Sequence, residues 1–94
     1  MKLLMVVLSE RAQRNLEKVP EHIESKLVSW INAIKEQGLE VVRRIAGYHD
    51  EPLQGARFGQ RSIRLNRSYR AIYEVTEQGD IRIVEIKEVT KHEY

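Results

Sequence analysis

The order of apolar and polar residues along the chain predicts a strand, two helices and then three further strands. The run Leu3–Leu8 is continuously apolar and contains adjacent β-branched residues, which predicts a short strand buried on both faces. Ser9 is suited to cap a first helix, and Pro20 would end that helix because it cannot donate to the backbone ladder. A second helix is predicted up to Gly38, since apolar residues recur there at helical spacing: Ile23, Leu27, Trp30, Ile31 and Ile34.

The second half of the chain alternates between apolar and polar residues, the pattern of strands with one covered face. Alternating stretches occupy 60–65 and 69–75, residues 81–89 are rich in β-branched side chains, and turn residues separate the three stretches. The preceding segment 46–59 contains three glycines and a proline, so we expect an irregular loop there. The order β-α-α-β-β-β predicts an α+β fold, an antiparallel sheet with a helical hairpin packed on one face and the other face open.

Length and composition restrict the class of protein. A chain of 94 residues, 41% hydrophobic and 32% charged, is expected to form one globular domain over residues 1–94. No apolar run is long enough to cross a membrane and no signal-peptide cleavage pattern is present, so we expect a cytoplasmic protein. The chain has no cysteine and no metal-ligand spacing of histidines and carboxylates, so no metal or other cofactor is expected.

Charge is unevenly distributed, although the formal net charge is only +2. Residues 52–73 contain five arginines and no acid, whereas residues 74–94 contain six acids and three bases. Strand alternation places Arg64 and Arg70 together on the open face of the sheet, and arginine suits phosphate because its planar group donates two parallel hydrogen bonds. The remaining candidates for contacting an anionic partner are Arg57, Arg61, Arg67 and the loop residue His49.

A less specific interpretation of these arginines stays open at this point. They could be individually solvated around a hairpin, or could pair across strands with acids such as Glu74 and Glu88, as many surface charges do.

The last four residues, Lys91-His92-Glu93-Tyr94, directly follow a predicted strand and include two groups able to move protons. Histidine titrates near neutrality and a tyrosine hydroxyl can donate or orient. The alternative is a frayed chain end without a role.

Together these segments resemble the RelE/ParE superfamily of bacterial type II toxins, and within it the RelE/HigB-like mRNA interferases. The resemblance covers nearly the whole chain, and its most specific parts are Tyr69-Arg70-Ala71-Ile72-Tyr73 and the terminal tetrad. It implies a toxin that cleaves mRNA in the ribosomal A site and is silenced by a cognate antitoxin. The oligomeric state is not predicted.

The resemblance also implies roles for individual residues. Arg70 matches the family's arginine at the scissile phosphate, and Arg64 matches a basic residue on the preceding strand. The C-terminal catalytic group is matched by Lys91, His92 and Tyr94. Because this chain has His92 where RelE has arginine, we assign the acid/base role to His92, with Tyr94 assisting in a metal-independent attack by the RNA 2′-hydroxyl.

Two other functions remain compatible with the sequence. ParE-type relatives share the fold and inhibit DNA gyrase without cleaving RNA, so the fold alone cannot choose between them. The third option is an inactive relative that only binds its antitoxin.

Overall fold

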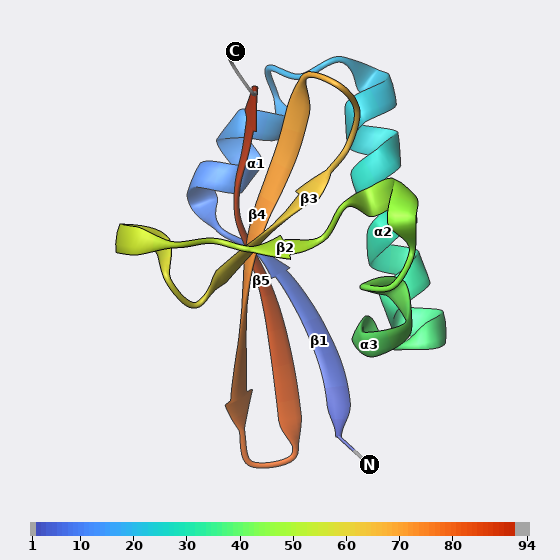
Figure 1. Ribbon diagram of the computed structural model, residues 1–94, viewed down its shortest axis with the longest axis vertical. Coiled ribbons are helices and arrows are strands. Elements are labelled where there is room, and N and C mark those ends of the chain that lie inside the picture. The colour runs from blue at the N-terminus through green and yellow to red at the C-terminus, as the bar shows by residue number, and fades with distance from the viewer. Residues whose placement is uncertain (1, 92–94) are drawn as a thin grey trace.

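The computed structural model describes residues 2–91 and has the expected order of helices and long strands (Figure 1). Its elements are β1 (Leu3–Leu8), α1 (Glu10–Leu16), α2 (Glu21–Gln37), α3 (Leu39–Val42), the 3₁₀ turn η1 (Ala46–Tyr48), β2 (Glu51–Pro52), the 3₁₀ turn η2 (Gly55–Arg57), β3 (Gln60–Arg64), β4 (Tyr69–Gln78) and β5 (Ile81–Lys91). The expected loop 46–59 is therefore partly ordered into a short strand and two 3₁₀ turns. None of the helices in this part of the chain is long and apolar enough to cross a bilayer.

The five strands form one sheet in the order β1-β5-β4-β3-β2. All neighbouring strands are antiparallel except β1 and β5, which run parallel. The α+β fold class is confirmed. The expectation that β1 is buried on both faces is wrong, because β1 is an edge strand and only one face of the sheet is covered there. Leu3 and Met5 are 71% and 51% exposed, while the alternate residues Leu4 and Val6 pack on the core.

Helix α2 supplies the covering layer, and α2 and α3 lie on the same side of the strands in Figure 1. The predicted apolar stripe of α2 faces the core, with Ile31 only partly buried and the other four residues buried. The Trp30 ring lies 5.0 Å from that of Tyr73 on β4. Trp30 is thus a core residue, as the helical spacing indicated. Burial of each such large side chain contributes about 1.5–3 kcal/mol to folding. The helix ends at Gly38, whose φ of +91° favours glycine.

Helix α1 is tied to the part of β5 that lies beyond β1. The Ser9 hydroxyl accepts from the Ala12 N–H as the N-cap and donates to the Lys87 carbonyl at 2.6 Å. The Asn15 side chain accepts from the Val89 N–H at 3.0 Å. Beyond the end of β1, side chains of α1 and its N-cap therefore provide hydrogen-bond partners for the backbone of β5.

A β-bulge in β5 changes which residues point to the open face. Tyr73 on β4 lies opposite Ile86, but its neighbour Ile72 lies opposite Glu88, so Lys87 is an extra residue. Without the bulge Glu88 would continue on the Ile86 side, toward the core. With it, Glu88 lies across from Ile72 on the open face.

Candidate functional site

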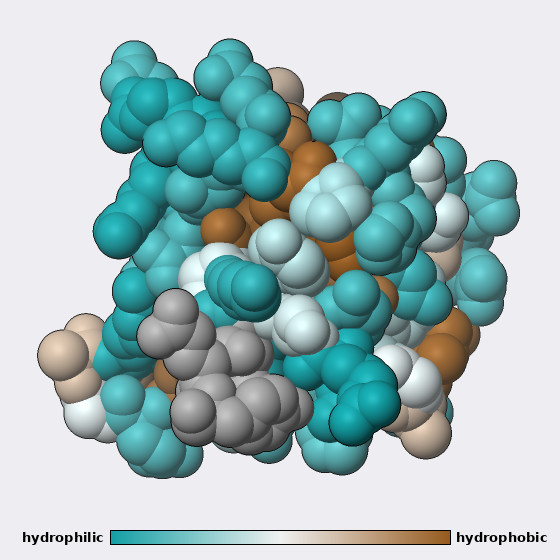
Figure 2. Space-filling view, turned by 90° about the horizontal axis from the view of Figure 1, so that it is seen from above, coloured by the Kyte–Doolittle hydropathy of each residue, from teal (hydrophilic) through white to brown (hydrophobic). Residues whose placement is uncertain are grey.

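Arg64 and Arg70 face each other on the open side of the sheet. They are register partners on β3 and β4, and Ser62 and Ile72 form the next pair on the same face. Figure 2 views the molecule from the end where β4 begins, and that end is mostly hydrophilic. The expected convergence of Arg64 and Arg70 on one surface is confirmed.

The two guanidinium groups differ in their contacts. Arg70 Nη1 donates to Ser62 Oγ at 2.9 Å and to Glu51 Oε1 at 3.1 Å. Within residues 2–91, the Arg64 guanidinium forms no hydrogen bond or ion pair. Like charges directly opposite one another destabilise a strand pair, and an anion bound between them would be attracted by both. This arrangement is suited to a phosphate group.

Glu51 is a residue of this site that the sequence did not single out. It precedes the arginine-rich segment, and β2 places it opposite Ser62 and beside Arg70. Its side chain is 48% exposed, so it is accessible to a substrate and can accept a proton. The short strand β2 was not predicted, because its glycine- and proline-containing surroundings are typical of a loop.

Arg57 reaches the same face from η2. Its Nη2 lies 2.8 Å from Glu88 Oε1, and its Nη1 donates to Gln60 Oε1 at 3.1 Å. Arg11 of α1 pairs with the other oxygen of Glu88 at 3.2 Å. Pairing with Glu88 therefore occurs, but it involves Arg57 and Arg11 instead of Arg64 and Arg70.

Arg61 is separated from these arginines, because it lies opposite Tyr73 and shares the face covered by α2. Its Nε donates to Asp50 Oδ1 at 2.6 Å, and the Tyr73 hydroxyl donates to Asp50 Oδ2 at 2.5 Å. Arg43 Nε donates to the same hydroxyl at 3.3 Å. Burial and the hydrogen bond to Asp50 raise the pKa of Tyr73 to about 12. These contacts give Arg61 a structural role at the boundary of the core.

The other predicted residues lie at the margins of the site. Lys91 ends β5 opposite Tyr69 and lies on the same face as the buried Val89, two residues earlier, so it is directed away from the face of Arg70. His49 is exposed and has a φ of +50°, and Arg67 is exposed in the turn between β3 and β4. His92 and Tyr94 lie outside the described residues. Within 2–91, no group of three histidines or acids could hold a metal ion.

A comparison with protein-family models places the chain in a known family. Residues 6–92 match the model described as "ParE toxin of type II toxin-antitoxin system, parDE". The chain belongs to this ParE toxin family. Membership confirms the resemblance to the RelE/ParE superfamily and makes the protein a toxin of a type II toxin-antitoxin system.

Several solved structures share the fold of this chain. A YoeB/ParE toxin from Agrobacterium tumefaciens superposes with a TM-score of 0.73 at 20% identity, covering 95% of this chain and 99% of that one. YafQ from E. coli superposes with a TM-score of 0.73 at 16% identity, covering 98% of this chain and 94% of that one. A chain of the RelBE2 toxin-antitoxin complex from Mycobacterium tuberculosis superposes with a TM-score of 0.67 at 24% identity, covering 94% of this chain and 96% of that one. No curated protein sequence matches this ParE-family chain. At these identities the structural matches establish a shared fold.

Proposed function

We propose that this toxin is an endoribonuclease that cleaves mRNA in the ribosomal A site and so arrests translation. The observation that carries the proposal is the facing pair Arg64 and Arg70, with the Glu51 carboxylate 3.1 Å from Arg70. Phosphate-binding cations beside a proton acceptor are the groups that metal-independent RNA cleavage requires.

In the proposed reaction a general base removes the proton of the 2′-hydroxyl, and the oxygen attacks the adjacent phosphorus. The bond to the 5′ oxygen breaks, and a general acid donates a proton to that oxygen, leaving a 2′,3′-cyclic phosphate and a 5′-hydroxyl. Arg64 and Arg70 hold the negative charge that develops on the phosphate. Losing one such contact costs about 10²- to 10³-fold in rate.

The acid and the base require two groups. We assign the base to Glu51, because its carboxylate is exposed beside Arg70. His92 is assigned the role of acid, with Tyr94 assisting and Lys91 adding positive charge, on the strength of the family motif. The RNA-binding roles of Arg57, Arg61, Arg67 and His49 stay predictions.

The proposed partners follow from the shape of the site. The open face of a 94-residue chain does not enclose a substrate, so a larger body, the ribosome, would hold the RNA in place. A cognate antitoxin is the second proposed partner, since the similar RelBE2 structure is a toxin-antitoxin complex. Both partners are consistent with a cytoplasmic location.

A second candidate function is inhibition of DNA gyrase without RNA cleavage. The family model that matches this chain is that of ParE toxins, which favours this alternative. The arginine pair with its neighbouring carboxylate favours the endoribonuclease.

Brief induction of the toxin in cells, followed by primer extension on abundant mRNAs, tests the proposal. New 5′ ends inside translated codons are expected with the wild-type toxin and Arg14→Gln, a control whose arginine lies on α1 and pairs with Glu10. They are expected to disappear with Arg70→Gln and His92→Gln. DNA damage and inhibited supercoiling by purified gyrase, without RNA cuts, would identify the gyrase inhibitor instead.

A further inference from the structure

Next to the arginine pair the open face contains a hollow of about 470 Å³ between α1 and η2. Figure 1 shows α1 and the η2 loop on the side of the strands opposite α2. The hollow is lined by Ser9, Arg11, Arg57, Gln60, Lys87 and Glu88. Three of these side chains are cationic and one is acidic.

The bulge in β5 brings the charged residues of this hollow together. By making Lys87 an extra residue, it turns Glu88 onto the open face opposite Ile72. Glu88 then accepts a hydrogen bond from Arg57 through one oxygen and forms an ion pair with Arg11 through the other. One carboxylate thus holds two arginines that belong to different elements.

The charge that the hollow presents to solvent is positive. The Glu88 side chain is 9% exposed, whereas those of Arg11 and Arg57 are 67% and 41% exposed. A guanidinium has five N–H donors, so both arginines keep donors for a further ligand while one edge faces Glu88. The buried carboxylate orients the two cations, and solvent meets mainly their free sides.

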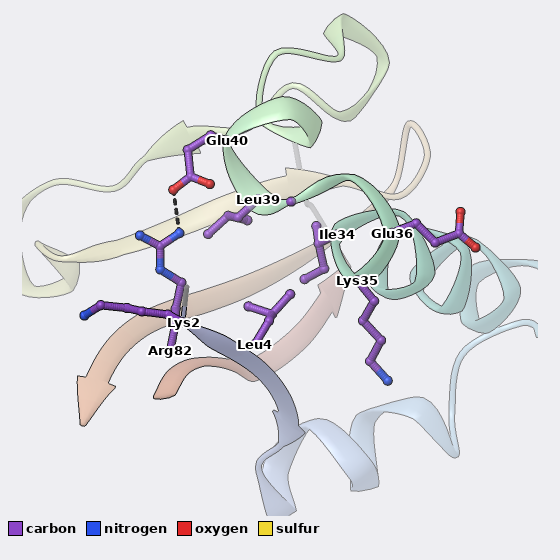
Figure 3. A pocket seen from close by; sticks show the side chains of 9 residues that line it. Lys2, Leu4, Ile34, Lys35, Glu36, Leu39, Glu40 and Arg82 are labelled. Carbon is purple, nitrogen blue, oxygen red and sulfur yellow. Dashed lines mark hydrogen bonds and ion pairs between the residues drawn. The ribbon is translucent and has the colours of Figure 1, made fainter. Parts of the chain in front are cut away.

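A second hollow shows what is specific about this one. The hollow in Figure 3, of about 510 Å³, is lined by three cations and two acids over the apolar Leu4, Ile34 and Leu39. Its acid Glu40 is exposed and pairs with Arg82. Acids at that opening oppose an anion, whereas the acid of the α1–η2 hollow is covered.

We propose that the α1–η2 hollow is a second RNA-phosphate site, with Arg11 and Arg57 as ligands and Glu88 as their positioning residue. The inference rests on the proposed function, in which Arg64 and Arg70 bind the scissile phosphate. Ile72, opposite Glu88, is two residues from Arg70, about 7 Å along β4. A neighbouring phosphate of a single strand passing over Arg70 can therefore reach the hollow.

The test measures binding of an uncleavable 2′-O-methyl RNA oligonucleotide, and of empty 70S ribosomes, as a function of salt concentration. For single strands the salt slope changes by about 0.7 for each phosphate contact. We expect Arg11→Gln to weaken binding and reduce the slope by this amount. Arg14→Gln is the matched control, because it removes the same charge from the same helix at a position equally exposed, 67%.

Glu88→Gln separates positioning from bulk charge. It raises the net charge by one, so unspecific attraction alone would tighten RNA binding. If Glu88 positions Arg11 and Arg57, binding weakens and the slope falls in Glu88→Gln, while the urea midpoint shows whether the variant is folded. Tighter binding by folded Glu88→Gln would overturn the positioning role.

The two arms distinguish the origin of the phosphate. A reduced salt slope of Arg11→Gln with the oligonucleotide identifies the mRNA strand as the source of the phosphate. A slope reduced only with ribosomes identifies ribosomal RNA. Equal behaviour of Arg11→Gln and Arg14→Gln in both arms overturns the inference. Since the oligonucleotide cannot be cleaved, failure of the primer-extension experiment would refute the proposed activity without deciding this binding result.

Discussion

Arg64 on β3 lies directly opposite Arg70 on β4, so two guanidinium groups share one row of the open face. Arg70 forms an ion pair with the half-exposed Glu51, while Arg64 forms none within residues 2–91. Repulsion between the facing like charges destabilises the free protein. A bound phosphate would be attracted by both arginines, so the pair would then be stabilising. The facing arginines therefore lower the stability of the free protein at the position where we propose that RNA binds.

Arg64→Gln should therefore stabilise the fold and impair RNA cleavage. We expect the free energy of unfolding to rise by about 0.2–1 kcal/mol, because a like-charge pair is removed. RNA cleavage should fall about 10²- to 10³-fold, because one cation at the phosphate is lost. Urea denaturation and cleavage of mRNA on purified ribosomes measure the two effects. A variant less stable than wild type would show that Arg64 supports the fold instead.

Glu51→Gln tests the proposed general base. Loss of a general base reduces the rate by about 10²- to 10⁴-fold, whereas the hydrogen bond to Arg70 can be kept by the amide oxygen. Glu74→Gln is the matched control, since Glu74 lies on the same face of β4 as Arg70 and is opposite Gln60 in register. The single-turnover rate on programmed ribosomes is the measurement. Equal rates in the two variants would remove Glu51 from the mechanism.

Arg61→Leu should act mainly on stability. Asp50, whose side chain is 1% exposed, would lose its cationic partner and keep only the Tyr73 hydroxyl as a donor among residues 2–91, at a cost of about 3–5 kcal/mol. The double variant Asp50→Asn, Arg61→Leu removes both charges and should regain part of this loss. Chemical denaturation of the single and double variants measures both. Loss of RNA binding in a fully stable Arg61→Leu would assign Arg61 to the RNA contact.

Tyr73 should make the protein sensitive to alkaline pH. Its folded pKa of about 12 lies above the usual value of 10.0, so the unfolded chain loses this proton first as pH rises. Stability should decline by about 2–3 kcal/mol between pH 10 and pH 12 because of this group. Tyr73→Phe should be less stable at neutral pH by about 1–3 kcal/mol, through the lost hydrogen bonds, and should decline less above pH 10. Parallel decline of both proteins would contradict the assignment.

Local patterns predicted the helices, the long strands and the shared face of Arg64 and Arg70. Each of these depends on periodicity within a segment or on two strands joined by a short turn. The pattern of residues 3–8 was less informative, because a continuous apolar run does not show whether a strand is central or at an edge. The sheet order decided that β1 is an edge strand.

The apparent excess of five arginines in residues 52–73 illustrates the limit of reading charge along the chain. Three of them pair with acids outside this segment: Arg57 with Glu88, Arg61 with Asp50 and Arg70 with Glu51. The paired residues are 31, 11 and 19 positions apart, respectively. A local count of charge cannot include such partners.

The sequence by itself determined the fold class, the amphipathic α2 and the strand phase that turns Arg64 and Arg70 to one side. These follow from repeating side-chain directions, which neighbouring residues specify. Only the tertiary structure decided that Glu51 lies beside Arg70 and that Glu88 joins Arg11 to Arg57. Those contacts depend on the pairing of β2 with β3 and on the bulge in β5, which arise when distant segments pack and backbone hydrogen bonds are satisfied across the sheet.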